Sequence, residues 1–67
     1  MHMKNIKTIA VFEKQFSSER RVVIMTLLDD HIYSIKRFID GEYDAEATSH
    51  GIVEANEIML DFIKESL

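Results

Sequence analysis

The sequence contains no cysteine and no tryptophan, and only two glycines occur among its 67 residues. Without cysteine there is no disulfide framework, and this absence agrees with a reducing compartment. Gly41 and Gly51 are isolated, so a glycine-rich phosphate-binding loop is excluded. Because there is also no long apolar run, we expect neither a signal peptide nor a membrane span and predict a cytoplasmic protein.

The chain is long enough for one hydrophobic core only. A unit of this size buries only roughly 60% of the surface that its unfolded chain exposes, so its stability is marginal without additional support. Since disulfides are excluded, a second copy or another partner is the expected support. We predict a single domain over residues 1–67, with residues 1–3 either disordered or a cloning remnant.

The net charge of −4 is unevenly distributed along the chain. From Asp40 onward there are eight acidic residues and a single basic one, Lys64. This balance opposes the positive field that attracts nucleic acids. The expected partner is therefore a protein, and nucleic-acid binding is disfavoured.

Strand-like runs separated by polar turns dominate the first two thirds of the chain. β-branched and aromatic residues favour strands at residues 4–16, 21–28 and 31–39, and a short acidic edge strand at 42–48. Residues 4–16 would also form a helical stripe. The segment 31–39 has a helical alternative as well, with Asp30 as N-cap and Gly41 after its end. Asp40-Gly41 favours a hairpin, because both residue types tolerate positive φ.

Residues 51–67 are predicted to form the clearest helix, with Ser49 or Gly51 as N-cap. Its apolar face is predicted to contain Ile52, Ala55, Met59, Phe62 and Ile63. The predicted fold is α+β, a four-stranded antiparallel β-meander followed by one C-terminal α-helix. The alternative is a β-hairpin or ribbon followed by two helices.

Two-residue turns at Asp29-Asp30 and Asp40-Gly41 would fix the register of the sheet. Ile24 would then lie opposite Ile35, Val22 opposite Arg37, and Arg37 opposite Asp44 in a surface ion pair worth about 0.2–1 kcal/mol. Both sheet faces would be apolar, and one helix covers only one of them. We therefore expect a homodimer formed through the sheet face or through the helix.

Two groups of residues are candidate binding surfaces. The first combines basic and aromatic residues on one sheet face, a composition typical of sheets that stack nucleic-acid bases. In the alternative interpretation the aromatic residues belong to the core and the basic side chains lie over them. The members of this group are Lys14, Arg21, Lys36, Phe16, Phe38 and Tyr43. The second group is acidic and would either dock a basic patch on another protein or imitate the charges of a nucleic-acid backbone. In the alternative interpretation these residues only keep the surface solvated. The members of this group are Glu42, Asp44, Glu46, Glu54, Glu57, Asp61 and Glu65.

No catalytic or metal-binding pattern is present. His31 beside Asp29 and Asp30 has no second ligand cluster to complete a site, and His50 is expected at the surface. The serines lack a His and acid at a recognisable spacing. We therefore predict a non-enzymatic protein without cofactor or metal.

Two resemblances suggest regulatory roles. The small, acidic, cysteine-free composition is similar to that of phage-type inhibitors, which implies an inhibitor or regulator of a larger macromolecular machine. Residues 21–29, a helix over 30–40, and the Ser49, Ile52 and Ala55 pattern resemble the strand, helix and helix order of ribbon-helix-helix repressors. That resemblance implies a nucleic-acid-binding transcriptional regulator or antitoxin.

Overall fold

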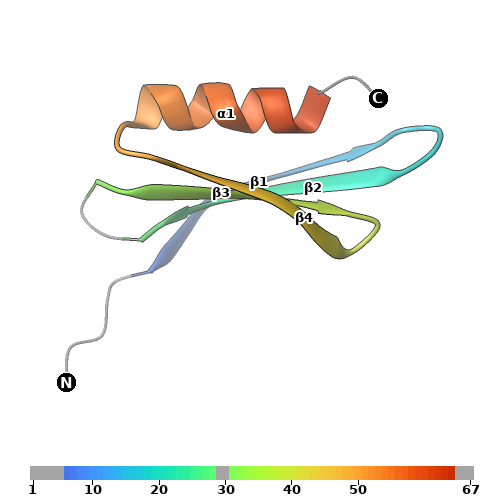
Figure 1. Cartoon of the computed structure of the whole chain (residues 1–67), viewed down its shortest axis with the longest axis horizontal. Coiled ribbons are helices and arrows are strands. Elements are labelled where there is room, and N and C mark those ends of the chain that lie inside the picture. The colour runs from blue at the N-terminus through green and yellow to red at the C-terminus, as the bar shows by residue number, and fades with distance from the viewer. Residues whose placement is uncertain (1–5, 29–30, 65–67) are drawn as a thin grey trace.

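The computed structural model describes residues 6–28 and 31–64. Four strands, β1 (Lys7–Gln15), β2 (Arg20–Leu27), β3 (Tyr33–Ile39) and β4 (Glu42–Ser49), form one antiparallel sheet in the order β1-β2-β3-β4 (Figure 1). Helix α1 (Ile52–Lys64) follows. The predicted meander and helix are confirmed. The helical alternative for residues 30–40, and with it the ribbon-helix-helix arrangement, is wrong because β3 is a strand.

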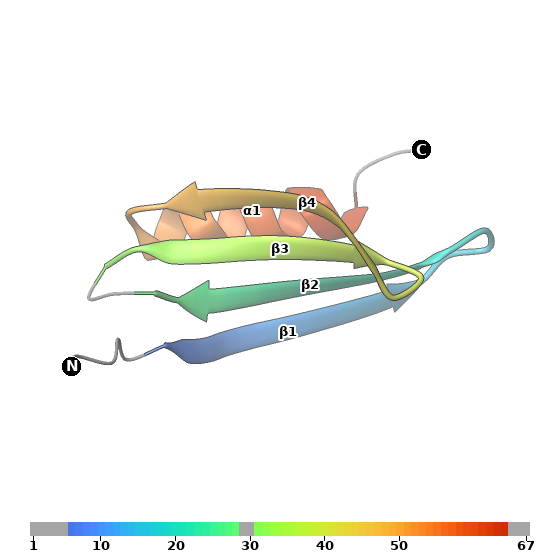
Figure 2. The ribbon, with the colours of Figure 1, turned by 60° about the horizontal axis from the view of Figure 1, so that its bottom comes forward.

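Helix α1 packs on one face of the sheet. In Figure 2 the other face is turned toward the viewer, α1 lies behind β4 and β3, and β1 forms the lower edge of the sheet. That other face, the open face, has no covering layer in the described chain. No helix among residues 6–28 and 31–64 has the length and apolar character needed to cross a membrane.

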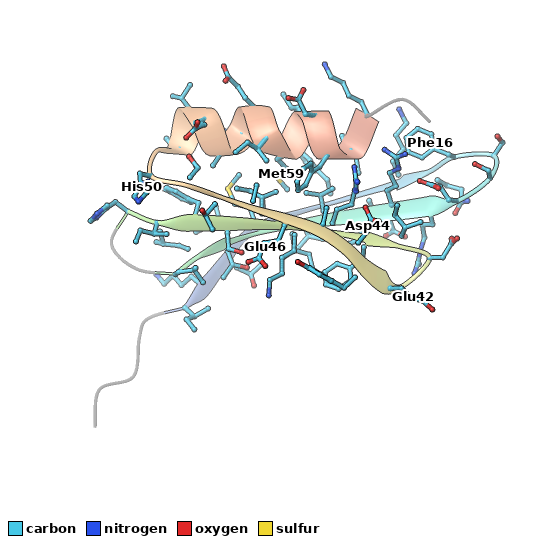
Figure 3. All side chains as sticks on the ribbon, in the orientation of Figure 1. Phe16, Glu42, Asp44, Glu46, His50 and Met59 are labelled. Atoms are coloured by element: carbon cyan, nitrogen blue, oxygen red, sulfur yellow. The ribbon has the colours of Figure 1, made fainter. Side chains whose placement is uncertain are left out.

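The core lies between α1 and the middle strands. Its fully buried members alternate along the strands and recur at i, i+4 on the helix, as the two periodicities require; they are Val23, Met25, Ile35, Ala55 and Met59. Figure 3 places Met59 between helix and sheet. The predicted apolar face of α1 packs at Ala55 and Met59, with Phe62 and Ile63 half-buried at its C-terminal end. Ile52, which was also predicted on this face, is 42% exposed.

The β3–β4 turn has the predicted two-residue geometry. Asp40 and Gly41 have φ values of 53° and 88°, and their neighbours Ile39 and Glu42 are paired. Positive φ at both positions is the type I′ pattern that matches the twist of a hairpin. The Asp40 carboxylate also accepts a hydrogen bond of 3.0 Å from the Arg20 N–H.

The β2–β3 connection differs from the prediction. Leu27 pairs with Tyr33, and the Leu28 N–H donates to the Ile32 carbonyl oxygen at 2.8 Å. The connection between the paired residues Leu28 and Ile32 is therefore three residues long, one more than expected. The predicted turn residues Asp29 and Asp30 lie outside the described residues.

The extra turn residue shifts the β2–β3 register by one. Ile24 lies opposite Lys36 instead of Ile35, and Val22 lies opposite Phe38. Since side chains alternate between faces, this shift reverses the face of every β3 residue relative to the prediction. Ile35 consequently joins the core, and Lys36 and Phe38 lie on the open face.

A bulge in β4 changes the β3–β4 register beyond Phe38. Arg37 pairs with Ala45, and the register shifts between Arg37 and Phe38, so Asp44 is the extra residue. The Arg37 Nε still donates to the Asp44 carboxylate at 2.8 Å. The predicted ion pair is therefore confirmed, although the predicted register is not.

Ser49 and Gly51 share the start of α1. The Gly51 carbonyl oxygen accepts the first helical hydrogen bond, from the Ala55 N–H at 3.0 Å, so Gly51 is the N-cap. The Ser49 hydroxyl accepts a hydrogen bond from the Gly51 N–H at 3.2 Å and donates one to the Glu54 carboxylate at 2.8 Å. Both predicted residues thus stabilise the helix start.

Candidate functional site

The predicted basic and aromatic surface is divided between the two faces of the sheet. Lys14 and Arg21 are paired on the helix side. The Lys14 ammonium lies 5.3 Å from the centre of the Phe16 ring, and the Arg21 guanidinium carbon lies 5.0 Å from it. In Figure 3, Phe16 is on the helix side of the sheet and Glu46 on the opposite side.

Lys36, Phe38 and Tyr43 occupy the open face instead. Phe38 pairs with Tyr43, and their ring centres are 6.1 Å apart in an edge-to-face arrangement. The prediction that all six residues share one face is wrong, because it used the two-residue β2–β3 turn. Arg21 is moreover only 2% exposed and donates to Glu19, so its charge is used inside the fold.

A continuous apolar stripe crosses the open face. Val11 of β1 lies opposite Ile24 of β2, Val22 lies opposite Phe38, and Phe38 lies opposite Tyr43 of β4. We call these five residues the open-face stripe. Val11 is 55% exposed and Tyr43 is 59% exposed, while the other three are half-buried. The stripe therefore offers aliphatic side chains on β1 and β2 and aromatic side chains on β3 and β4 to whatever covers it.

The charges beside the open-face stripe cancel. On one flank Arg20 forms an ion pair of 3.2 Å with Glu13. On the other flank Lys36 lies opposite Glu46. Each flank thus has one cation and one anion, which is unlike the net positive surface that a phosphate backbone needs.

The predicted acidic surface also separates into two kinds of residue. Three of its carboxylates are bonded within the fold: Asp44 to Arg37, Glu46 to Ser34 and Tyr43, and Glu54 to Ser49. Three others, Glu42, Glu57 and Asp61, are exposed and have no hydrogen bond or ion pair within the described part of the chain. Glu65 lies outside the described residues.

Two of these available carboxylates adjoin exposed apolar side chains on α1. Val53, Glu57, Leu60 and Asp61 are spaced as neighbours on a helix surface. Val53 is 71% exposed and Leu60 is 49% exposed, and Figure 3 shows side chains projecting from α1 away from the sheet. We call these four residues the helix shoulder. Neither Val53 nor Leu60 was predicted as a binding residue, although both are apolar and lie outside the predicted core stripe.

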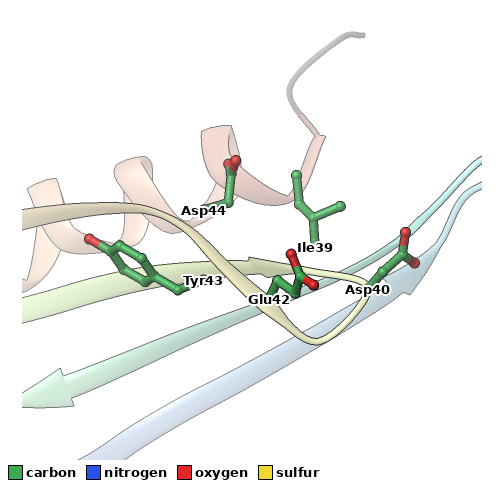
Figure 4. A pocket seen from close by; sticks show the side chains of 5 residues that line it. All are labelled: Ile39, Asp40, Glu42, Tyr43 and Asp44. Carbon is green, nitrogen blue, oxygen red and sulfur yellow. The ribbon is translucent and has the colours of Figure 1, made fainter.

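A shallow pocket of about 420 Å³ lies at the β3–β4 turn (Figure 4). It is lined by Ile39, Asp40, Glu42, Tyr43 and Asp44. Asp40 accepts from the Arg20 backbone and Asp44 from the Arg37 side chain, so these carboxylates are already used. Glu42, the third carboxylate of the lining, has no hydrogen bond or ion pair within the described chain.

Tyr43 is the residue here with a perturbed pKa. Desolvation raises its pKa above 10.0, and the Glu46 carboxylate raises it further by its charge and by accepting a hydrogen bond of 3.3 Å from the phenol. Asp44 adds a smaller effect in the same direction. The phenol is therefore a proton donor to Glu46 at neutral pH.

Folding brings together two histidines that are distant in the sequence. The rings of His31 and His50 are 6.4 Å apart between centres. Within residues 6–28 and 31–64, no group of three or more His, Asp or Glu side chains is arranged to hold a metal ion. This histidine pair therefore has no third ligand among those residues.

Searches with this chain against protein-family models, curated proteins and solved structures found no match.

Proposed function

We propose that this chain is a non-enzymatic, homodimeric binding module that docks a protein partner through the helix shoulder. The observation that supports this most is the exposure of Val53 and Leu60 beside Glu57 and Asp61. Exposed apolar groups gain from being covered, and the adjacent carboxylates select a partner that brings cations. A role as inhibitor or regulator of a larger machine remains a prediction from composition.

The chemistry of the shoulder defines the partner as both basic and apolar. Glu57 and Asp61 have no ion pair within the described chain, so a partner's Lys or Arg forms a new pair without breaking an existing one. Val53 and Leu60 require an apolar side chain between those cations. A basic amphipathic helix satisfies both requirements.

The test uses a labelled helical peptide with one leucine face and one lysine face, and measures its fluorescence anisotropy with the full chain. We expect binding that weakens as salt rises. Glu57→Lys should weaken binding by about fivefold, the upper range for a surface ion pair.

Glu42→Lys is the matched control, because Glu42 is also exposed and unbonded in the described structure but lies at the β3–β4 turn. It makes the same change in net charge and should leave binding unchanged. Equal losses from both variants would mean that the peptide senses only net charge. A single-stranded oligonucleotide that binds the wild-type chain at low salt would favour the nucleic-acid alternative.

A further inference from the structure

The open face is an apolar surface that the described fold leaves uncovered, and we infer that a second copy of this chain covers it. The two sheets stack face to face, with both helices on the outside. Sheets pack in this way at a separation of about 10 Å, with side chains from the two faces interdigitating. Four observations favour this occupant.

The first observation is the shape of the open-face stripe. It runs across all four strands, from Val11 on β1 through β2 to Phe38 on β3 and Tyr43 on β4. A two-fold axis directed along such a stripe places one copy's apolar residues on those of the other. An identical chain is therefore complementary to this face without any change in backbone.

The second observation is electrical neutrality. The flanks of the stripe contain Glu13 with Arg20 and Lys36 with Glu46, two cations and two anions in all. Although the chain has a net charge of −4, two copies meet here without a net repulsion between the apposed faces. Contact through the outer side of α1 would instead bring together Glu57 and Asp61 of both copies, carboxylates that have no ion pair within the described chain.

The third observation is that both edges of the sheet are protected. β1 has a register shift between Thr8 and Ala10, and charged Glu13 and Lys14 follow along the same strand. β4 has its bulge at Asp44. Bulges and charges on edge strands prevent edge-to-edge pairing, so the face is the part of the sheet that remains available.

The fourth observation is area. Four strands about 4.8 Å apart and about 25 Å long give roughly 480 Å² of sheet face per copy. Two copies together cover about 1,000 Å², which is near the lower limit for a specific interface. The core of the described chain has only five fully buried apolar residues, so this additional burial matters for stability. We therefore expect a concentration-dependent dimer.

The face-to-face dimer determines where the helix shoulders lie, and this part of the inference rests on the proposed function of the shoulder. With the open faces together, the two helix shoulders point outward on opposite sides of the dimer. The dimer then offers two equivalent docking surfaces. Partners that are themselves linked or multivalent would gain avidity from this geometry.

Sedimentation equilibrium of the full chain, from low micromolar to millimolar concentration, tests the inference. The wild-type chain should approach twice the monomer mass as concentration rises. Val11→Lys should raise the dimer dissociation constant at least tenfold, because it places a charge in the apolar stripe. Val53→Lys, the same substitution of a more exposed valine on α1, should leave that constant unchanged.

Far-ultraviolet circular dichroism establishes that each variant is folded, and Tyr43→Lys replaces Val11→Lys if the latter is not. A wild-type monomer at every concentration would overturn the inference, as would a dimer lost in Val53→Lys but kept in Val11→Lys. Binding of an oligonucleotide to the open face would also overturn it. Peptide binding by the shoulder is measured separately. A failed dimer with intact peptide binding would therefore contradict this inference and the homodimeric part of the proposed function, and would leave the docking role of the helix shoulder standing.

Discussion

Arg37 holds the last turn of α1 to the sheet through Phe62. The Arg37 guanidinium carbon lies 5.0 Å from the centre of the Phe62 ring, and its Nη1 donates to the Phe62 carbonyl oxygen at 3.4 Å. Arg21 donates to the same carbonyl oxygen at 3.3 Å. Cations at this position satisfy the free carbonyls of a helix end and interact favourably with its dipole.

Replacement of Arg37 by methionine should therefore reduce the free energy of unfolding by about 2 kcal/mol, since it removes charged hydrogen bonds and a cation–π contact. Urea denaturation measures this loss. Arg20→Met is the control, because the Arg20–Glu13 pair is exposed and should contribute less than about 1 kcal/mol. Equal losses in the two variants would show that Arg37 does not anchor the helix.

Gly41→Ala should destabilise the hairpin by about 1 kcal/mol, because Gly41 has a φ of 88° that residues with a Cβ rarely adopt. Gly41→Asn should cost less, since asparagine tolerates positive φ better. Both free energies come from the same urea experiment. If alanine and asparagine are equivalent here, backbone conformation does not determine the stability of this turn.

The contrast between the two turns shows what the sequence could predict. Asp40-Gly41 was predictable because a two-residue hairpin demands residue types that accept positive φ. The stretch Asp29-Asp30-His31 contains no glycine that would mark one turn type, so the length of the β2–β3 connection, and with it the face of Phe38, could not be predicted from the sequence. The amphipathic pattern of α1 was clear, and the core residues Ala55 and Met59 followed from it. The burial of Arg21 could not be predicted from the sequence, because arginine usually stays at the surface.

Glu57→Lys should raise stability slightly while weakening binding to the basic peptide. Glu57 and Asp61 are like charges at i, i+4, so replacing one with a cation should gain about 0.2–0.5 kcal/mol in helix stability. Urea denaturation and peptide titration of the same preparation separate the two effects. Loss of both stability and binding would indicate that Glu57 supports the fold instead of the docking surface.

Tyr43 should ionise above pH 10.0, because desolvation and the Glu46 carboxylate raise its pKa. The folded-state value lies above the unfolded one, so this group stabilises the fold below pH 10.0, and the contribution is lost as pH rises through the folded-state pKa. Ultraviolet absorbance of a Tyr33→Phe variant follows Tyr43 alone. Glu46→Gln should lower the pKa of Tyr43 towards 10.0; an unchanged value would remove Glu46 as a cause.

The most direct test of the two surfaces is nuclear magnetic resonance on one labelled sample. Addition of the leucine and lysine peptide should shift the signals of Val53, Glu57 and Leu60, whereas dilution of the free protein should shift the methyl signals of Val11 and Ile24. The buried Val23 and Met25 should respond little to either. Peptide-induced shifts confined to the open face, with α1 unaffected, would contradict the assignment of the helix shoulder as the docking surface.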